Sequence, residues 1–103
     1  MTVKETTDLQ AHRAEQVRAY FQGRKPDCEV SIRCDFDFWR FYFVRDDKNA
    51  YIFDISRHVV ADWSGEQIVS MLESAGWEHI LEANPGRVPH FTNTGLDFHP
   101  RPA

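Results

Sequence analysis

Three polar residues in the middle of the chain, Asp54, Ser56 and His58, are of the types that form a nucleophile triad. Because they alternate along the sequence, a strand would place all three side chains on one face. In a triad, however, the histidine lies between the nucleophile and the acid, whereas here Ser56 lies between the other two. Along a strand, Asp54 and His58 would also be roughly 13 Å apart. We therefore expect structural or strand-end roles for these residues.

Metal binding and acid–base catalysis are further kinds of chemistry to consider. Four residues towards the C-terminus are of metal-binding types: His79, His90, Asp97 and His99. Their spacing matches no known ligand pattern, so we predict no metal site. Asp35 and Asp37 can in principle form a carboxylate pair, but beside a strand junction they fit a turn better. Because the motifs of nucleotide-binding loops, serine hydrolases and zinc proteases are also absent, we predict no catalytic residue, no cofactor and no enzyme.

The length and composition of the chain fit one small globular domain. Of its 103 residues, 42% are hydrophobic and 14% are aromatic. We expect a single α+β domain over residues 1–103, with a core at about 8–82 and a proline-rich tail at 83–103. The net charge of -4 and the isoelectric point of about 5.7 are unlike those of nucleic-acid or anionic-membrane binding domains. We therefore expect neither nucleic acid nor a membrane as a partner.

The cysteines and the N-terminus bear on the compartment. No segment has the apolar run of a signal peptide or of a membrane span, which predicts a cytoplasmic protein. Cys28 and Cys34 lie in one predicted strand, where their Cα atoms would be roughly 20 Å apart. A disulfide requires less than about 7 Å. We therefore expect both cysteines to be buried free thiols.

The hydrophobic periodicity predicts the elements that must position these side chains. Residues 8–22 have the apolar stripe of a helix, which Gly23 and Pro26 would end. After this helix, three segments are predicted to form an antiparallel meander of strands: 28–35, 36–45 and 50–55. Residues 77–82 are predicted as a short fourth strand. The tail is expected to be irregular or to form a loose hairpin around Thr94 and Gly95.

A second short helix, residues 65–75, has the clearest boundary signals in the chain. Ser64 followed by Gln67 fits a capping box, in which each side chain binds a backbone N–H of the first turn. Gly76 fits the left-handed position that commonly ends a helix. The sequence therefore predicts both ends of this helix.

Six aromatic side chains occur within residues 36–43, so both faces of this predicted strand are apolar. One hypothesis is a central strand that helices cover on one side and the tail covers on the other. The second hypothesis is that Trp39, Phe41 and Phe43 remain exposed and form a surface for a partner. The sequence leaves both hypotheses open.

Charge is distributed unevenly along the chain. Residues 1–51 contain nine basic and nine acidic side chains, whereas residues 52–103 contain three basic and seven acidic ones. Glu66 and Glu73 lie seven positions apart and therefore on one side of the second helix. This side is either a solvated helix face or an acidic surface that attracts a basic partner.

These observations favour a non-enzymatic interaction domain that binds a protein partner or a second copy of itself. The expected binding residues are three aromatic rings, two arginines of the same strand and the two glutamates: Trp39, Phe41, Phe43, Arg40, Arg45, Glu66 and Glu73. The order of elements, the small size and the acidity resemble those of small bacterial and phage inhibitor or immunity proteins. This resemblance implies an inhibitor or immunity-like role.

The alternative is a small-molecule binding domain. In this hypothesis the sheet and the tail enclose a pocket, and Arg40 or Arg45 holds an anionic group of the ligand. Five aromatic rings would line the pocket: Trp39, Phe41, Phe43, Phe91 and Phe98. A third hypothesis is a small enzyme that uses His58 or His79 as an acid–base group. The sequence supports it less than the interaction domain or the small-molecule binding domain.

Overall fold

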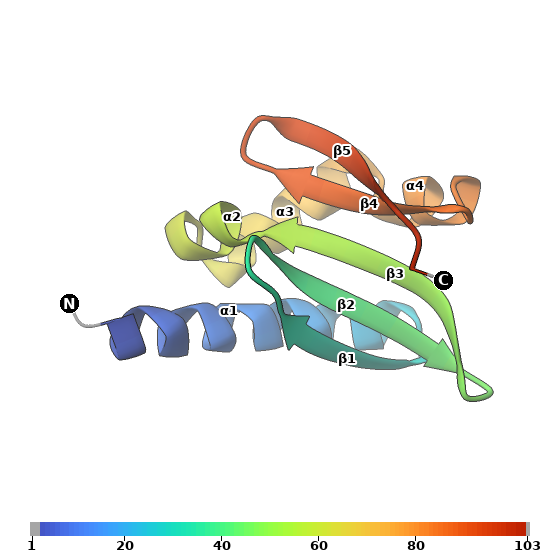
Figure 1. Ribbon diagram of the computed structural model, residues 1–103, viewed down its shortest axis with the longest axis horizontal. Helices are drawn as coiled ribbons and strands as arrows, with labels where there is room; N and C mark the ends of the chain where they lie inside the picture. The colour runs from blue at the N-terminus through green and yellow to red at the C-terminus, as the bar shows by residue number, and fades with distance from the viewer. Residues whose placement is uncertain (1–2, 103) are drawn as a thin grey trace.

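The computed structural model describes residues 3–102, with side chains from Asp8 onward. This part of the chain forms an α+β fold of four helices and five strands (Figure 1): α1 (Val3–Arg24), β1 (Glu29–Cys34), β2 (Phe38–Arg45), β3 (Lys48–Ser56), α2 (Arg57–Asp62), α3 (Gly65–Ala75), α4 (Trp77–Ala83), β4 (Arg87–Thr92) and β5 (Gly95–Pro100). The fold class agrees with the prediction, but the sheet has more strands than the predicted meander.

The five strands form one mixed sheet in the order β1-β2-β3-β4-β5. The first three strands form the predicted antiparallel meander, and β4 and β5 add an antiparallel hairpin to its edge. The strands β3 and β4 are parallel and pair at only two positions, Asp54 with His90 and Ile55 with Phe91. Because parallel neighbours require a crossover, α2, α3 and α4 connect these two strands.

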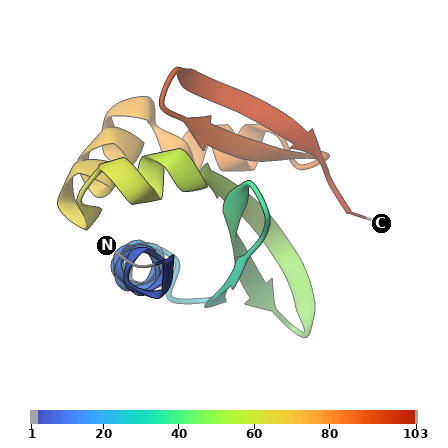
Figure 2. The ribbon, with the colours of Figure 1, turned by 60° about the vertical axis from the view of Figure 1, so that its left-hand side comes forward.

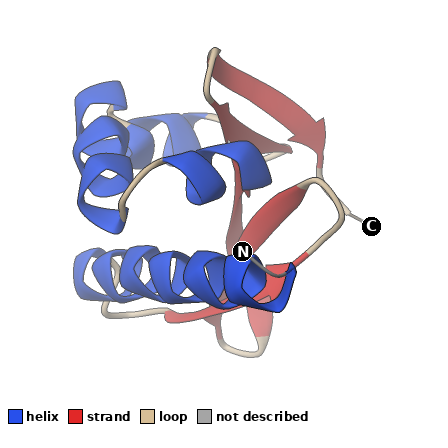
Figure 3. Cartoon of the chain, turned by 90° about the vertical axis from the view of Figure 1, so that its left-hand side faces the viewer, coloured by secondary structure: helices blue, strands red, loops and turns tan. Residues whose placement is uncertain are grey.

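The helices lie on one face of the sheet, and the hydrophobic core lies between the two layers (Figure 3). Phe21 of α1 is central to this core, since its ring centroid lies 5.2 Å from those of Phe41 and Phe43 and 4.6 Å from that of Trp77. Trp39, Phe41 and Phe43 alternate along β2 on the face towards the helices, and none is more than 5% exposed. The expectation that these three rings form an exposed surface is therefore wrong, because the helices cover them.

The opposite face of β2 has a different environment from the one predicted. The sequence suggested that the tail covers this face, but the tail instead extends the sheet as β4 and β5 (Figure 2). Phe38, Arg40, Tyr42 and Val44 are half-buried here by neighbouring side chains of the sheet. The central strand is thus β3, and β2 is covered by helices on one side only.

The predicted helix at 65–75 is confirmed as α3, with both hydrogen bonds of its capping box present. Gly76 ends it in the left-handed region, at φ 69°. The segment after Gly76 is a helix, α4, and not the predicted strand. Trp77 and Leu81 lie one helical turn apart, and each is only 2% exposed, so core packing of this face stabilises the helix.

The helices at the two ends of the meander also differ from the prediction. The helix α1 begins earlier than residue 8 and continues through Gly23, which has no positive φ, to Arg24. Pro26 lies just beyond this end. The helix α2 was not predicted. It begins directly after β3, where the Ser56 hydroxyl caps it by accepting a hydrogen bond of 3.2 Å from the backbone N–H of His58.

The proline-rich tail forms an ordered hairpin around Thr94 and Gly95, one of the two forms expected from the sequence. Pro89 is compatible with a strand here because it lies outside the two positions at which β4 pairs with β3. Phe91 and Val88 are buried, so the tail contributes to the hydrophobic interior.

Both cysteines are free, but only Cys28 is buried as predicted. Cys34 is exposed because it is the last residue of the edge strand β1. Among the described residues, no helix combines the length and the apolar character needed to cross a membrane.

Candidate functional site

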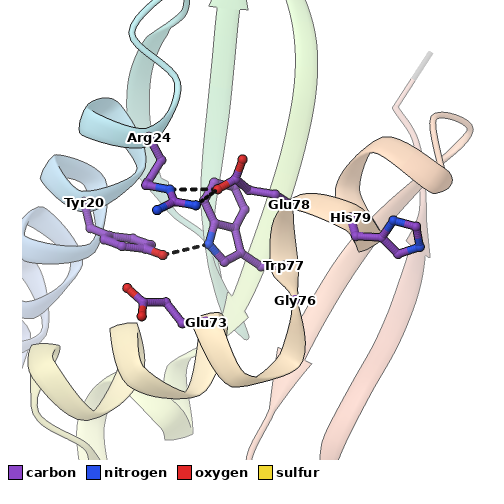
Figure 4. Close-up of a pocket in the computed structure, with 7 residues that line it drawn as sticks. All are labelled: Tyr20, Arg24, Glu73, Gly76, Trp77, Glu78 and His79. Atoms are coloured by element: carbon purple, nitrogen blue, oxygen red, sulfur yellow. Dashed lines mark hydrogen bonds and ion pairs between the residues drawn. The ribbon is translucent and has the colours of Figure 1, made fainter.

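A groove lies between α1 and α3 and continues to the start of α4 (Figure 4). It consists of two adjoining hollows of about 440 Å³ each, both lined by Tyr20 and Glu73. We refer to this feature as the α1–α3 groove. Its lining side chains come from the three helices: Gln16, Tyr20, Arg24, Glu66, Val69, Ser70, Glu73, Trp77, Glu78 and His79.

Tyr20 and Trp77 hold the groove together at the point where the three helices meet. The indole nitrogen of Trp77 donates a hydrogen bond of 2.9 Å to the Tyr20 hydroxyl, and the two rings are in edge-to-face contact. Figure 4 shows the Glu73 carboxylate beside the same hydroxyl. Burial raises the pKa of Tyr20, and the charge of Glu73 raises it further, although the hydrogen bond from Trp77 acts in the opposite direction. Tyr20 therefore stays a neutral phenol.

Basic residues from the first half of the chain neutralise several acidic residues of the second half. Glu78 pairs with Arg24 at 2.5 Å, and Glu82 pairs with Lys25 at 2.7 Å. Asp54 is likewise paired, with an arginine of β2. Among the side chains that the structure describes, four acidic residues of the second half have no basic group within 4.0 Å: Asp62, Glu66, Glu73 and Asp97.

Two of these four unpaired carboxylates, Glu66 and Glu73, line the α1–α3 groove. Between them the lining includes Tyr20 and Val69, which supply an aromatic ring and an aliphatic side chain. Carboxylates accept hydrogen bonds from ammonium and guanidinium groups, while apolar surface packs against the methylene stems of lysine and arginine. The groove therefore has the chemistry to bind basic side chains.

The two arginines expected to bind a partner are already paired within the chain. Arg40 donates two hydrogen bonds of 2.8 Å to Asp54, and its side chain is only 12% exposed. Arg45 forms an exposed ion pair with Asp27 at 2.9 Å. Arg40 alternates with the buried Trp39 and Phe41 and so lies on the sheet face opposite to the helices, and Arg45 ends β2. Of the seven predicted binding residues, the structure brings only Glu66 and Glu73 together in one groove.

The small-molecule pocket expected between sheet and tail is not assembled. Phe91 belongs to the core together with the aromatic rings of β2. Phe98 lines a separate hollow of about 370 Å³ with Arg87 and His99. The predicted lining residues are thus divided between the core and the sheet edge.

A polar cluster on the uncovered sheet face joins Asp54 to Arg40 and to His99, two pairings that the sequence did not predict. The carboxylate of Asp54 is fully buried between Arg40 and His99, whose Nδ1 lies 2.7 Å from Asp54 Oδ2. The rings of His90 and His99 are 4.1 Å apart between centroids. His79 lies elsewhere, on α4, and the described residues contain no group of three side chains placed to hold a metal ion.

Sequence reasoning did not identify Tyr20, Val69 or Gln16 as site residues. Tyr20 and Val69 belong to apolar helical stripes, which are typical of core positions. No local pattern in the sequence relates Tyr20 to Trp77, because they are 57 positions apart. Comparison of the chain with family models, curated protein sequences and solved structures finds no match.

Proposed function

We propose that this chain is a non-enzymatic interaction domain that binds a basic segment of a protein partner in the α1–α3 groove. The observation that carries the proposal is the placement of two unpaired carboxylates, Glu66 and Glu73, in one groove. An inhibitor-like role, as expected from the sequence, is one form of this proposal.

Two physical effects act together in such a groove. Glu66 and Glu73 would attract a basic segment over a distance and accept hydrogen bonds from its lysine or arginine side chains. Tyr20 and Val69 would contact the aliphatic stems of the same side chains and supply affinity that salt does not screen. A second copy of this chain suits the groove less well, because the chain has a net charge of -4.

Chemical-shift mapping with an arginine-rich peptide tests the location of the binding surface. We expect backbone shifts to concentrate at Gln16, Tyr20, Val69 and Ser70, which line the groove beside the glutamates. A glutamate-rich peptide of equal length is the matched control and should leave the spectrum unchanged. Shifts centred on the acidic turn at Asp46 and Asp47, or spread evenly over all acidic residues, would overturn the proposal.

A further inference from the structure

A second hollow, of about 550 Å³, lies where β3 ends and α2 begins. Four segments that are distant in sequence meet there: α1, the turn between β1 and β2, the start of α2, and β4. Six of the residues that line it bear on ligand binding: Gln10, Phe36, Asp37, Arg57, Ala61 and His90. Glu66 and Glu73 do not line this hollow, so it is independent of the proposed function.

His90 provides the first sign that the hollow accepts a ligand. Among the described residues, its Nε2 is the one buried side-chain nitrogen or oxygen without a hydrogen-bond partner. A buried polar atom without a partner destabilises the fold unless another molecule satisfies it. Burial lowers the pKa of His90, and the neighbouring His99 lowers it further, so the ring is neutral near pH 7. A neutral imidazole has one nitrogen able to accept a hydrogen bond.

Arg57 provides the second sign. Its Nε donates a hydrogen bond of 3.2 Å to Gln10 Oε1, and its backbone N–H donates one of 3.0 Å to the Asp37 carbonyl. Among the described side chains, no carboxylate lies within 4.0 Å of the Arg57 guanidinium. Its two terminal nitrogens make no hydrogen bond to any described residue, so they can form a bidentate contact with a carboxylate.

Asp37 provides the third sign, because its carboxylate is also unpaired. It has no basic group within 4.0 Å among the described side chains, although its backbone is bonded to Arg57. The hollow therefore contains one unpaired positive group and one unpaired negative group that do not pair with each other. A ligand with a single charge would satisfy one of them and face like charge at the other.

We propose that this hollow binds a small zwitterion of the α-amino acid class. The ligand carboxylate contacts Arg57, and the ligand ammonium contacts Asp37 beside the His90 ring, which lines the hollow. Phe36, which is 86% exposed at the rim, and Ala61 offer apolar contact to the ligand side chain. The residues assigned here act by binding, and no bond of the ligand is made or broken.

Titration of the full chain with L-phenylalanine, followed by imidazole and guanidinium ¹⁵N shifts, tests this site. We expect the His90 and Arg57 side-chain signals to shift in the unmodified protein, so the test does not depend on the folding of a variant. N-acetyl-L-phenylalanine, which lacks the ammonium group, and L-phenylalaninamide, which lacks the carboxylate, should bind at least about tenfold more weakly. Inorganic phosphate, which carries only negative charge, should also bind more weakly.

Two substitutions and a matched control complete the test. Asp37→Asn and Arg57→Gln should each weaken L-phenylalanine binding by about tenfold or more, whereas Asp35→Asn in the same turn should leave it unchanged. Unchanged His90 and Arg57 signals at saturating L-phenylalanine would overturn the proposal. Equal losses in the Asp35 and Asp37 variants, or tighter binding of phosphate, would also overturn it, because neither result fits a zwitterion site.

Discussion

The indole nitrogen of Trp77 donates a hydrogen bond to the hydroxyl of Tyr20, which joins the first residue of α4 to a residue of α1. This contact positions two walls of the α1–α3 groove relative to each other. It also connects the groove to the core, because the Trp77 ring packs against Phe21. The geometry of the proposed binding surface and the stability of the fold therefore depend on the same pair.

Tyr20→Phe removes the acceptor and leaves the indole N–H of Trp77 without a partner at a position only 2% exposed. We expect a loss of about 1–3 kcal/mol in the free energy of unfolding, measured by chemical denaturation. Tyr51→Phe is the matched control, because the Tyr51 hydroxyl makes no hydrogen bond to any described residue. Equal losses in the two variants would contradict a specific role for the bond between Trp77 and Tyr20.

Gly76 and Gly23 should respond in opposite directions to substitution by alanine. Gly76 has a φ of 69°, which an L side chain rarely adopts, so Gly76→Ala should destabilise the protein by about 1–2 kcal/mol. Gly23 lies within α1, and an added Cβ would meet no atom within 4 Å. Gly23→Ala should therefore stabilise it by about 0.5–1 kcal/mol. Thermal unfolding of both variants measures the signs, and the same sign for both would refute this explanation.

The pair of Arg40 and Asp54 should matter far more for stability than the pair of Arg45 and Asp27. Asp54 is fully buried, so Asp54→Asn leaves the Arg40 guanidinium without a full counter-charge. This substitution should lower the free energy of unfolding by about 3 kcal/mol or more. Asp27 is exposed, and water replaces it as a partner of Arg45, so Asp27→Asn should cause little change. Urea denaturation of the two variants gives the comparison. Similar losses would mean that burial does not control the strength of these pairs.

His90 should make stability depend on pH. Its folded-state pKa is lowered, chiefly by burial and then by His99, while Asp54, Asp97 and Asp37 act in the opposite direction. The unfolded chain therefore binds a proton at His90 more readily than the folded chain does. Its contribution to the free energy of unfolding should be lost as the pH falls through about 6.5, the ordinary value for histidine.

Denaturation of the wild type and of His90→Gln between pH 7.5 and 5 measures this contribution. The difference in stability between the two proteins should shift in favour of the variant as the pH falls. His79→Gln, on the helix α4, keeps His90 in place and is the matched control for the loss of an imidazole. Parallel curves for the wild type and His90→Gln would show that His90 does not titrate differently in the folded protein.

The fold could be predicted where local signals decide the structure. The helix α3 was predicted from Ser64 to Gly76 because its caps are formed within a few residues of each other. The segment 77–82 was predicted incorrectly as a strand, since it belongs to the helix α4. Its helical form depends on burial of Trp77 and Leu81 against distant parts of the chain, which no local pattern reveals. The pairing of β4 with β3 likewise depends on a crossover of three helices.

The candidate site could be predicted only in part, for a related reason. Seven-residue spacing placed Glu66 and Glu73 on one side of α3, and the structure agrees. Sequence could not show that Arg24 and Lys25 neutralise Glu78 and Glu82, and hence which carboxylates remain unpaired. The rings of β2 were ambiguous because both faces of that strand are apolar, and only the packing of helices identifies the buried face.

The proposal that Glu66 and Glu73 make the α1–α3 groove a site for a basic protein segment predicts that these two charges matter more than acidic charges elsewhere. Calorimetric titration of an arginine-rich peptide into the wild type, Glu66→Gln/Glu73→Gln and Asp46→Asn/Asp47→Asn tests it most directly. Both variants remove two negative charges, but only the first removes them from the groove. We expect about tenfold weaker binding for the glutamate variant and nearly unchanged binding for the aspartate variant. Equal weakening in both variants, or none in the glutamate variant, would contradict the claim.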